Sequence, residues 1–129
     1  MIEAKATLSD YRQSPRKVRG VVNLIRGKSI LEAENLLSFV PKRSALPVQK
    51  LLASAVANAK NLSIPLENLI VKNISVDGGK ILYRRLPMSR GRAFVIRKRT
   101  SHVGIVLGEK TPKTKKTKTP SVKLRASKK

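Results

Sequence analysis

Residues 84–102, RRLPMSRGRAFVIRKRTSH, carry the pattern that most restricts how this chain can fold. They alternate apolar and polar side chains as β-strands do, yet they include seven Lys or Arg and no acidic residue. Neither face of such strands is apolar throughout, so neither can be placed against a core. The stretch therefore predicts strands that leave the body of the protein and are surrounded by something else.

We expect these strands to form a long antiparallel hairpin. Segments 80–86 and 93–99 would be its arms, and 87–92, which contains Gly91, its turn. Arms of about 8–10 residues project on the order of 25–35 Å at the usual rise per residue. An isolated two-stranded hairpin is marginal in water, so we expect this one to be ordered by burial in a polyanion. A solvated surface ribbon is the simpler alternative.

The overall charge supports a polyanionic partner. The 129 residues include 29 Lys or Arg and 7 Asp or Glu, a formal charge of +22. Two Tyr, two Phe and no Trp are too few for base stacking to dominate binding. Recognition of phosphates and of nucleic-acid shape is therefore favoured. An architectural DNA-binding protein with a basic β-arm and a binder of anionic membranes are the alternatives.

The remaining sequence predicts one small α+β domain. Alternating residues over 2–8, 69–76 and 103–107 indicate three strands, with a bulge near Asn73 and a break of the second strand at 77–79. Helices are expected over about 15–26, 30–40 and 44–61, the first begun by Ser14 and Pro15 and the second capped by Ser29 and Glu32. The fold class is therefore a three-stranded antiparallel sheet packed on three helices, with a protruding hairpin. The helix residues expected in the core are Val18, Val21, Val22, Ile25, Ile30, Ala33, Leu37, Val40, Val48, Leu51, Leu52, Ala55 and Ala59.

We expect a single domain over 1–108, made of a globular core at 1–79 and 102–108 and the extended hairpin at 80–101. Residues 109–129 are rich in Lys and Thr and poor in apolar side chains. They should be disordered until they meet a polyanion. The sequence predicts no signal peptide and no membrane span. The absence of Cys suits a cytoplasmic protein without disulfides.

No catalytic or metal site is expected. His102 is the only histidine, and Ser101 beside it is a neighbour in sequence without a triad's third member. Glu32 and Glu34 are the only closely spaced acids, and Glu32 already serves as a cap. We therefore predict no cofactor, no metal and no small-molecule substrate. His102 is expected to form a hydrogen bond at a strand end or to RNA.

Four segments resemble the uL22 family of bacterial large-subunit ribosomal proteins: RQSPRKVRGVVNLIRGK at 12–28, KLLASAVANA at 50–59, VDGG at 76–79 and GRAFVIRKRTSHVGIVL at 91–107. The resemblance spans about residues 3–108. It implies a structural protein that binds large-subunit rRNA, assists assembly and lies near the exit of the nascent-peptide tunnel. The hairpin would run inward through rRNA, with its tip in the tunnel wall near a constriction, where it affects macrolide action. The implied partners are rRNA, neighbouring ribosomal proteins and the nascent peptide.

The resemblance and the basic hairpin together define the expected site residues. One departure from the family is Met88, because a basic residue commonly follows the tip proline. The expected rRNA-binding residues are Arg12, Ser14, Arg16, Lys17, Arg19, Lys80, Arg84, Arg85, Arg97, Lys98, Arg99, Ser101 and His102. The expected tunnel-facing tip consists of Pro87, Met88, Ser89, Arg90, Gly91, Arg92 and Ala93.

Overall fold

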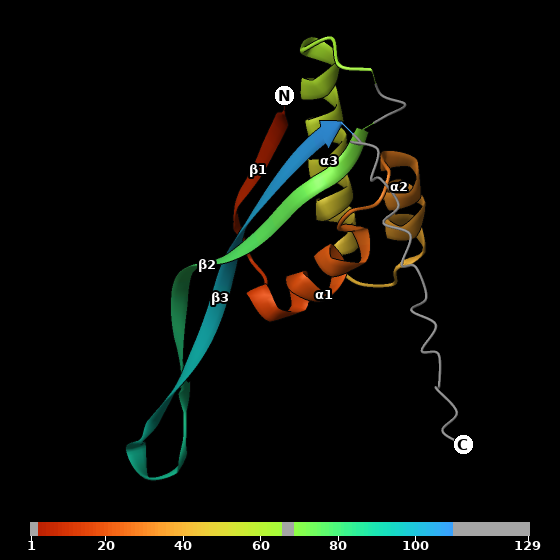
Figure 1. Ribbon diagram of the computed structural model, residues 1–129. Helices are drawn as coiled ribbons and strands as arrows, with labels where there is room; N and C mark the ends of the chain where they lie inside the picture. Colours follow the sequence, from red (N-terminus) through yellow and green to blue (C-terminus); the bar gives the residue numbers. More distant parts are fainter. Residues whose placement is uncertain (1–2, 66–68, 110–129) are drawn as a thin grey trace, which may run out of the picture.

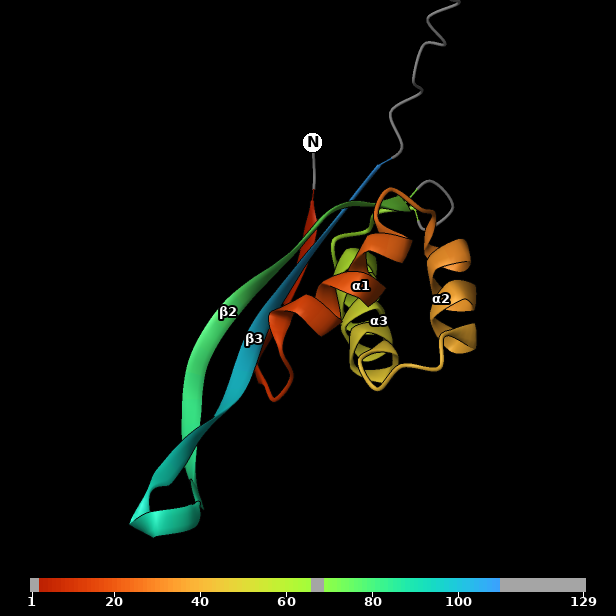
Figure 2. The same ribbon diagram turned by 90° about the horizontal axis from the view of Figure 1, so that it is seen from below.

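The computed structural model describes residues 3–65 and 69–109. The elements are β1 (Ala4–Tyr11), α1 (Pro15–Ile25), α2 (Ile30–Phe39), α3 (Ala45–Asn61), β2 (Leu69–Pro87) and β3 (Ala93–Glu109), with a 3-10 turn at Ser89–Gly91. The strands form one antiparallel sheet in the order β1-β3-β2. The helices gather on one side of this sheet, and β2 and β3 continue beyond them as a twisted hairpin (Figure 1, Figure 2). The predicted fold class is confirmed.

Rows of apolar side chains cross the sheet on the face that meets the helices. The register aligns three residues in each row, one from each strand: Ala4–Leu107–Val71, Ala6–Ile105–Ile74 and Leu8–Val103–Val76. All of these side chains are buried except Leu8, which is half-buried against the core. The other face carries exposed residues such as Lys5 and Ser75, as antiparallel sheets with one solvated face commonly do.

A β-bulge at Lys72 keeps the second strand in phase with these rows. Val71 pairs with Leu107 and Asn73 with Val106, so Lys72 is the extra residue. The insertion lets Val71 and Ile74 both face the core although they are three positions apart. The bulge predicted near Asn73 is confirmed.

The helices begin close to the predicted residues and bury most of the side chains that were expected in the core. Pro15 occupies the first turn of α1, and Ser14 is its N-cap residue without a side-chain cap bond. At α2, the Glu32 N–H donates to Ser29 Oγ at 3.4 Å. Every helix residue expected in the core is buried except Val40. Val40 is the C-cap residue of α2 and is half-buried against the core.

The predicted break at residues 77–79 is wrong. β2 runs without interruption from Leu69 to Pro87, with Asp77 paired to His102 and Gly78 to Ser101. The register then shifts between Gly78 and Ile81, so a second bulge replaces the break.

Close approach of β3 explains why this bulge contains glycine. A Cβ added at Gly79 would collide with Thr100 Oγ1 and lie 2.9 Å from His102 Nε2, whereas one added at Gly78 would meet nothing within 4 Å. Thr100 Oγ1 donates to the Lys80 carbonyl at 2.7 Å and fixes the bulge. Two consecutive glycines are typical of a turn, but here they form part of a β-bulge at the point where β2 extends beyond the core.

Beyond this bulge the hairpin has no core face. None of residues 80–99 is buried. Cross-strand pairs mix apolar and charged side chains, as in Arg84 opposite Ile96, and Phe94 near the tip is 64% exposed. The arms predicted at 80–86 and 93–99 are confirmed. At the turn, the Met88 N–H donates to the Arg92 carbonyl at 2.8 Å.

The domain boundaries stay a prediction. β3 includes Glu109, one position into the segment expected to be a disordered tail. The rest of that tail, 110–129, lies outside the described residues.

Candidate nucleic-acid interface

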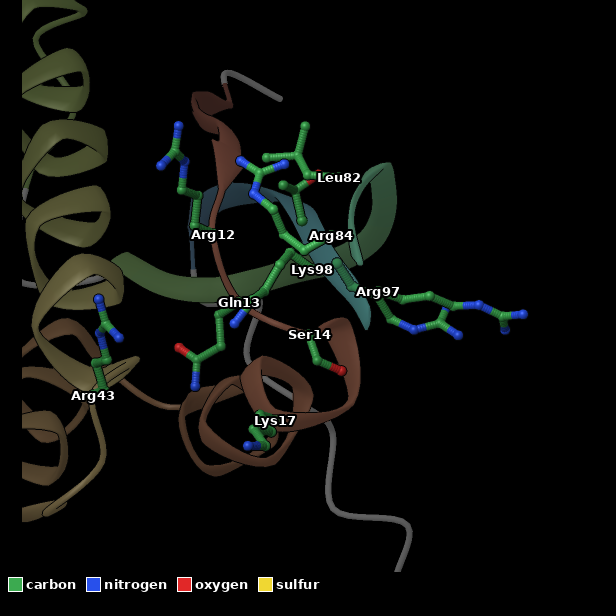
Figure 3. A pocket seen from close by; sticks show the side chains of 11 residues that line it. Arg12, Gln13, Ser14, Lys17, Arg43, Leu82, Arg84, Arg97 and Lys98 are labelled. Atoms are coloured by element: carbon green, nitrogen blue, oxygen red, sulfur yellow. The ribbon is translucent and has the colours of Figure 1, made fainter. Parts of the chain in front are cut away.

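A groove of about 760 Å³ lies between the root of the hairpin, the loop after β1 and the start of α1 (Figure 3). Residues from distant parts of the sequence meet there because the hairpin crosses the N-terminal end of α1. Its lining residues are Arg12, Gln13, Ser14, Lys17, Arg43, Leu82, Arg84, Arg97, Lys98, Arg99 and Thr100.

The groove is a concentration of positive charge. Seven of its eleven lining residues are Lys or Arg, and none is acidic. Across residues 3–65 and 69–109, the only ion pairs join Glu3 to Lys5, at 4.0 Å, and to Lys72. The groove cations therefore have no carboxylate partner in the described part of the chain. Their mutual repulsion would be relieved by a bound polyanion.

The loop that carries Arg12 is tied down on both sides. The Tyr11 hydroxyl donates to Gln13 Oε1 at 2.7 Å, and its oxygen lies 3.4 Å from the Arg43 carbonyl oxygen. The Asp10 N–H donates to His102 Nδ1 at 3.2 Å, and Asp10 has a left-handed φ of 53°. These contacts hold Arg12 over the groove.

The hairpin presents cations on both of its faces. Leu82 pairs with Lys98, so both lie on one face, and Arg84 follows two residues later on that face. Arg97 extends away from Lys17 and Arg43 in Figure 3. Cations on both faces would let a polyanion contact the hairpin from more than one side.

A second, smaller depression adjoins the groove. It is lined by Ser14, Pro15, Arg16, Lys17 and Arg99. The predicted residues at the start of α1 are therefore brought together with the return arm of the hairpin.

Arg19 has a structural contact that the sequence did not reveal. Its Nε and Nη2 donate to the Val76 carbonyl at 3.1 and 2.8 Å, and Arg26 Nη2 donates to the Ile74 carbonyl at 2.9 Å. Arg19 in α1 and Arg26, the residue that follows the helix, therefore reach carbonyls on the outer edge of β2. Such contacts occupy backbone carbonyls at a strand edge that could otherwise pair with a strand of another chain.

Ser101 and His102 lie outside the groove. Ser101 is fully buried, and its Oγ has no hydrogen-bond partner in the described part of the chain. His102 accepts from the Asp10 N–H near the end of β1, although His102 itself lies within β3 rather than at the strand end where the sequence analysis expected it. In this conformation Ser101 has no surface with which to contact RNA.

The remaining predicted residues are on the hairpin surface. Lys80 and Arg85 are exposed, and so is every residue of the tip from Pro87 to Ala93. Arg90 and Gly91 have left-handed φ values of 59° and 70°, which close the turn. For Arg90 this conformation is unfavourable relative to glycine.

Arg43 was missed by sequence reasoning. It follows α2, far along the chain from the other groove residues, and no local motif connects it with them. Only the path of the loop before α3 brings it to the groove.

Within the described residues no helix is long and apolar enough to cross a membrane. The same residues contain no cluster of three or more His, Cys, Asp or Glu side chains that could hold a metal ion.

Comparison with known proteins relates this architecture to a family. The family described as ribosomal protein L22p/L17e matches residues 6–108. The large ribosomal subunit protein uL22 of Thermus thermophilus is 56% identical over 110 residues, covering 84% of this chain and 97% of the relative. The chain belongs to the uL22 family. It is therefore a large-subunit ribosomal protein, in a family of structural proteins rather than enzymes, and its place is the ribosome of the cytoplasm.

Other members of the uL22 family are similarly close. Those of Caldicellulosiruptor saccharolyticus and Syntrophotalea carbinolica are 50% and 48% identical over 109 and 110 residues. Each alignment covers 84% of this chain, with 89% and 100% of the respective relative. The family expected from the sequence motifs is confirmed, and ribosomal RNA and ribosomal proteins are its general partners.

Proposed function

We propose that this chain binds large-subunit rRNA through the basic groove and the hairpin, and that it assists assembly of the subunit in this way. The observation that carries the proposal is the group of seven groove cations without a carboxylate partner in the described residues. Phosphates supply the missing negative charge, and sugars can cover the exposed aliphatic residues of the hairpin. The proposed contact residues are Arg12, Ser14, Arg16, Lys17, Arg43, Lys80, Arg84, Arg85, Arg97, Lys98 and Arg99.

The proposal gives the two ends of the molecule different roles. The globular domain lies near the exit of the nascent-peptide tunnel, and the hairpin tip lines the tunnel near its constriction and contacts the nascent peptide. Support comes from membership of the family together with the solvent exposure of every residue from 87 to 93. Arg90 and Arg92 supply charge at the tip, whereas Met88 adds an apolar side chain that is 54% exposed.

Sedimentation of a lysate at raised salt tests the RNA-binding proposal. We expect the chain to migrate with the large subunit in a constant one-to-one ratio. Release to the top of the gradient, or a ratio that varies with salt, would indicate that the chain is only a weak polyanion binder. In a parallel experiment, retention on duplex DNA equal to that on folded rRNA would favour the architectural DNA-binding alternative.

A further inference from the structure

The outer face of α2 differs in charge from the rest of this basic chain. Residues 30–41 contain no Lys or Arg but include two of the seven acidic residues, Glu32 and Glu34. Three large apolar side chains of the same helix are exposed to solvent: Leu31 is 75% exposed, Phe39 is 84% exposed and Leu36, less so, is 37% exposed.

These side chains form one stripe along the helix. Leu31, Asn35 and Phe39 are spaced four residues apart, so they follow one another down a single face. Phe39 is eight positions after Leu31, or about 12 Å along the axis. Glu32 and Glu34 fall on the two flanks of this stripe by the same helical spacing. We call Leu31, Glu32, Glu34, Asn35 and Phe39 the α2 stripe.

The α2 stripe is not needed to hold the helix on the protein. Ile30, Ala33 and Leu37 anchor α2 in the core. Leu31, Asn35 and Phe39 lie on the opposite side of the helix, and Glu34 is half-buried between the two sides. Exposure of a side chain as large as Phe39 to solvent is unfavourable, and the packing of α2 on the core does not require it.

The α2 stripe is separate from the RNA groove, because no residue of α2 lines that groove. α2 is the outermost helix, on the side of the helical layer away from the hairpin (Figure 2). Neither Glu32 nor Glu34 forms an ion pair within residues 3–65 and 69–109. Lys28 and Lys42 lie beyond the two ends of the helix and leave its middle acidic.

We propose that the α2 stripe docks a basic segment of another protein, one that carries at least one bulky apolar side chain. Lys or Arg of that segment pairs with Glu32 and Glu34, and its apolar side chain covers Leu31 and Phe39. Carboxylates at the rim of an exposed apolar surface make its binding specific for partners of complementary charge. RNA is disfavoured because its phosphates would meet two carboxylates. This docking goes beyond the proposed RNA binding and needs none of the groove contacts.

Site-specific photo-crosslinking in the assembled large subunit tests the docking. A photoreactive phenylalanine analogue replaces Leu31 in the full-length chain, and adducts are mapped by mass spectrometry. We expect an adduct with a protein segment rich in Lys or Arg. An adduct with rRNA, an adduct with an acidic or uncharged segment, or no adduct in intact subunits would overturn the proposal.

Variants separate docking from simple proximity. With the probe at position 31, Glu32→Lys and, separately, Phe39→Ser should each reduce the adduct at least tenfold. Glu109→Lys, which changes charge equally at an exposed position on β3, should alter it less than twofold. Phe39→Ser removes only an exposed side chain and so keeps the test valid if Glu32→Lys weakens α2. An adduct that both variants leave unchanged would refute the docking.

Discussion

Neutralising three groove cations should change how RNA binding depends on salt. Lys17, Arg84 and Lys98 come from α1 and from both hairpin arms and line one groove. Each cation that contacts a phosphate releases counterions, so each contributes roughly 0.7–0.9 to the slope of log affinity against log salt. The triple change to Gln should therefore reduce that slope by about 2–3. Between 50 and 200 mM salt, the loss of affinity should become about 20- to 40-fold smaller than in the unmodified chain.

The assay is equilibrium filter binding of the full-length chain to large-subunit rRNA at constant Mg²⁺. A matched control changes Lys28, Lys50 and Lys60 to Gln, because these lysines are exposed and lie outside the groove. The control should lower the slope by less than about one. If both triple variants changed the slope equally, total charge rather than the groove would govern binding. An unchanged slope in the groove variant would refute phosphate contacts by these residues.

Three further predictions concern the second bulge, the start of β1 and the hairpin tip. Gly79→Ala should lower the free energy of unfolding by about 1–3 kcal/mol in denaturant titrations, because its Cβ collides with Thr100, whereas Gly78→Ala should cost less than about 1 kcal/mol; equal losses would contradict the steric argument. The hydrogen bond and charge of Lys72 lower the pKa of Glu3 below 4.5, so this contact stabilises the fold above pH 4.5 and is lost as pH falls through the lowered pKa. Glu3→Gln should therefore flatten the acid side of a plot of melting temperature against pH, and an identical acid limb would exclude this contribution. Deleting residues 88–90 should leave subunit assembly intact in sucrose gradients and alter macrolide binding, and failure of assembly would instead make the tip an anchor.

Local periodicity made most of the globular fold predictable. The valines of α1 and the small residues of α3 repeat at helical spacing, and apolar and polar residues alternate along the strands. The buried face of each element can therefore be identified from its own sequence. The bulge at Lys72 was predictable as well, because Val71 and Ile74 cannot both face the core without it.

The second bulge and two contacts between elements were not predictable in the same way. Two consecutive glycines after Asp77 have the chemistry of a turn, and only the position of Thr100 on β3 reveals why Gly79 stays within a strand. Arg19 has the same local sequence character as the groove arginines, yet it binds a carbonyl of β2. Arg43 reaches the groove through the packing of α2 and α3, which no short motif encodes.

Burial of the hairpin in RNA is the central claim, and amide hydrogen exchange measures it directly. The amides of 81–86 and 93–99 should exchange rapidly in the free chain, because none of those residues is buried. In the assembled large subunit, they should exchange at least a hundredfold more slowly, approaching the amides of Val103 and Ile105 in the core. Equally rapid exchange in the free chain and the subunit would show that the hairpin is a solvated ribbon and would contradict the account.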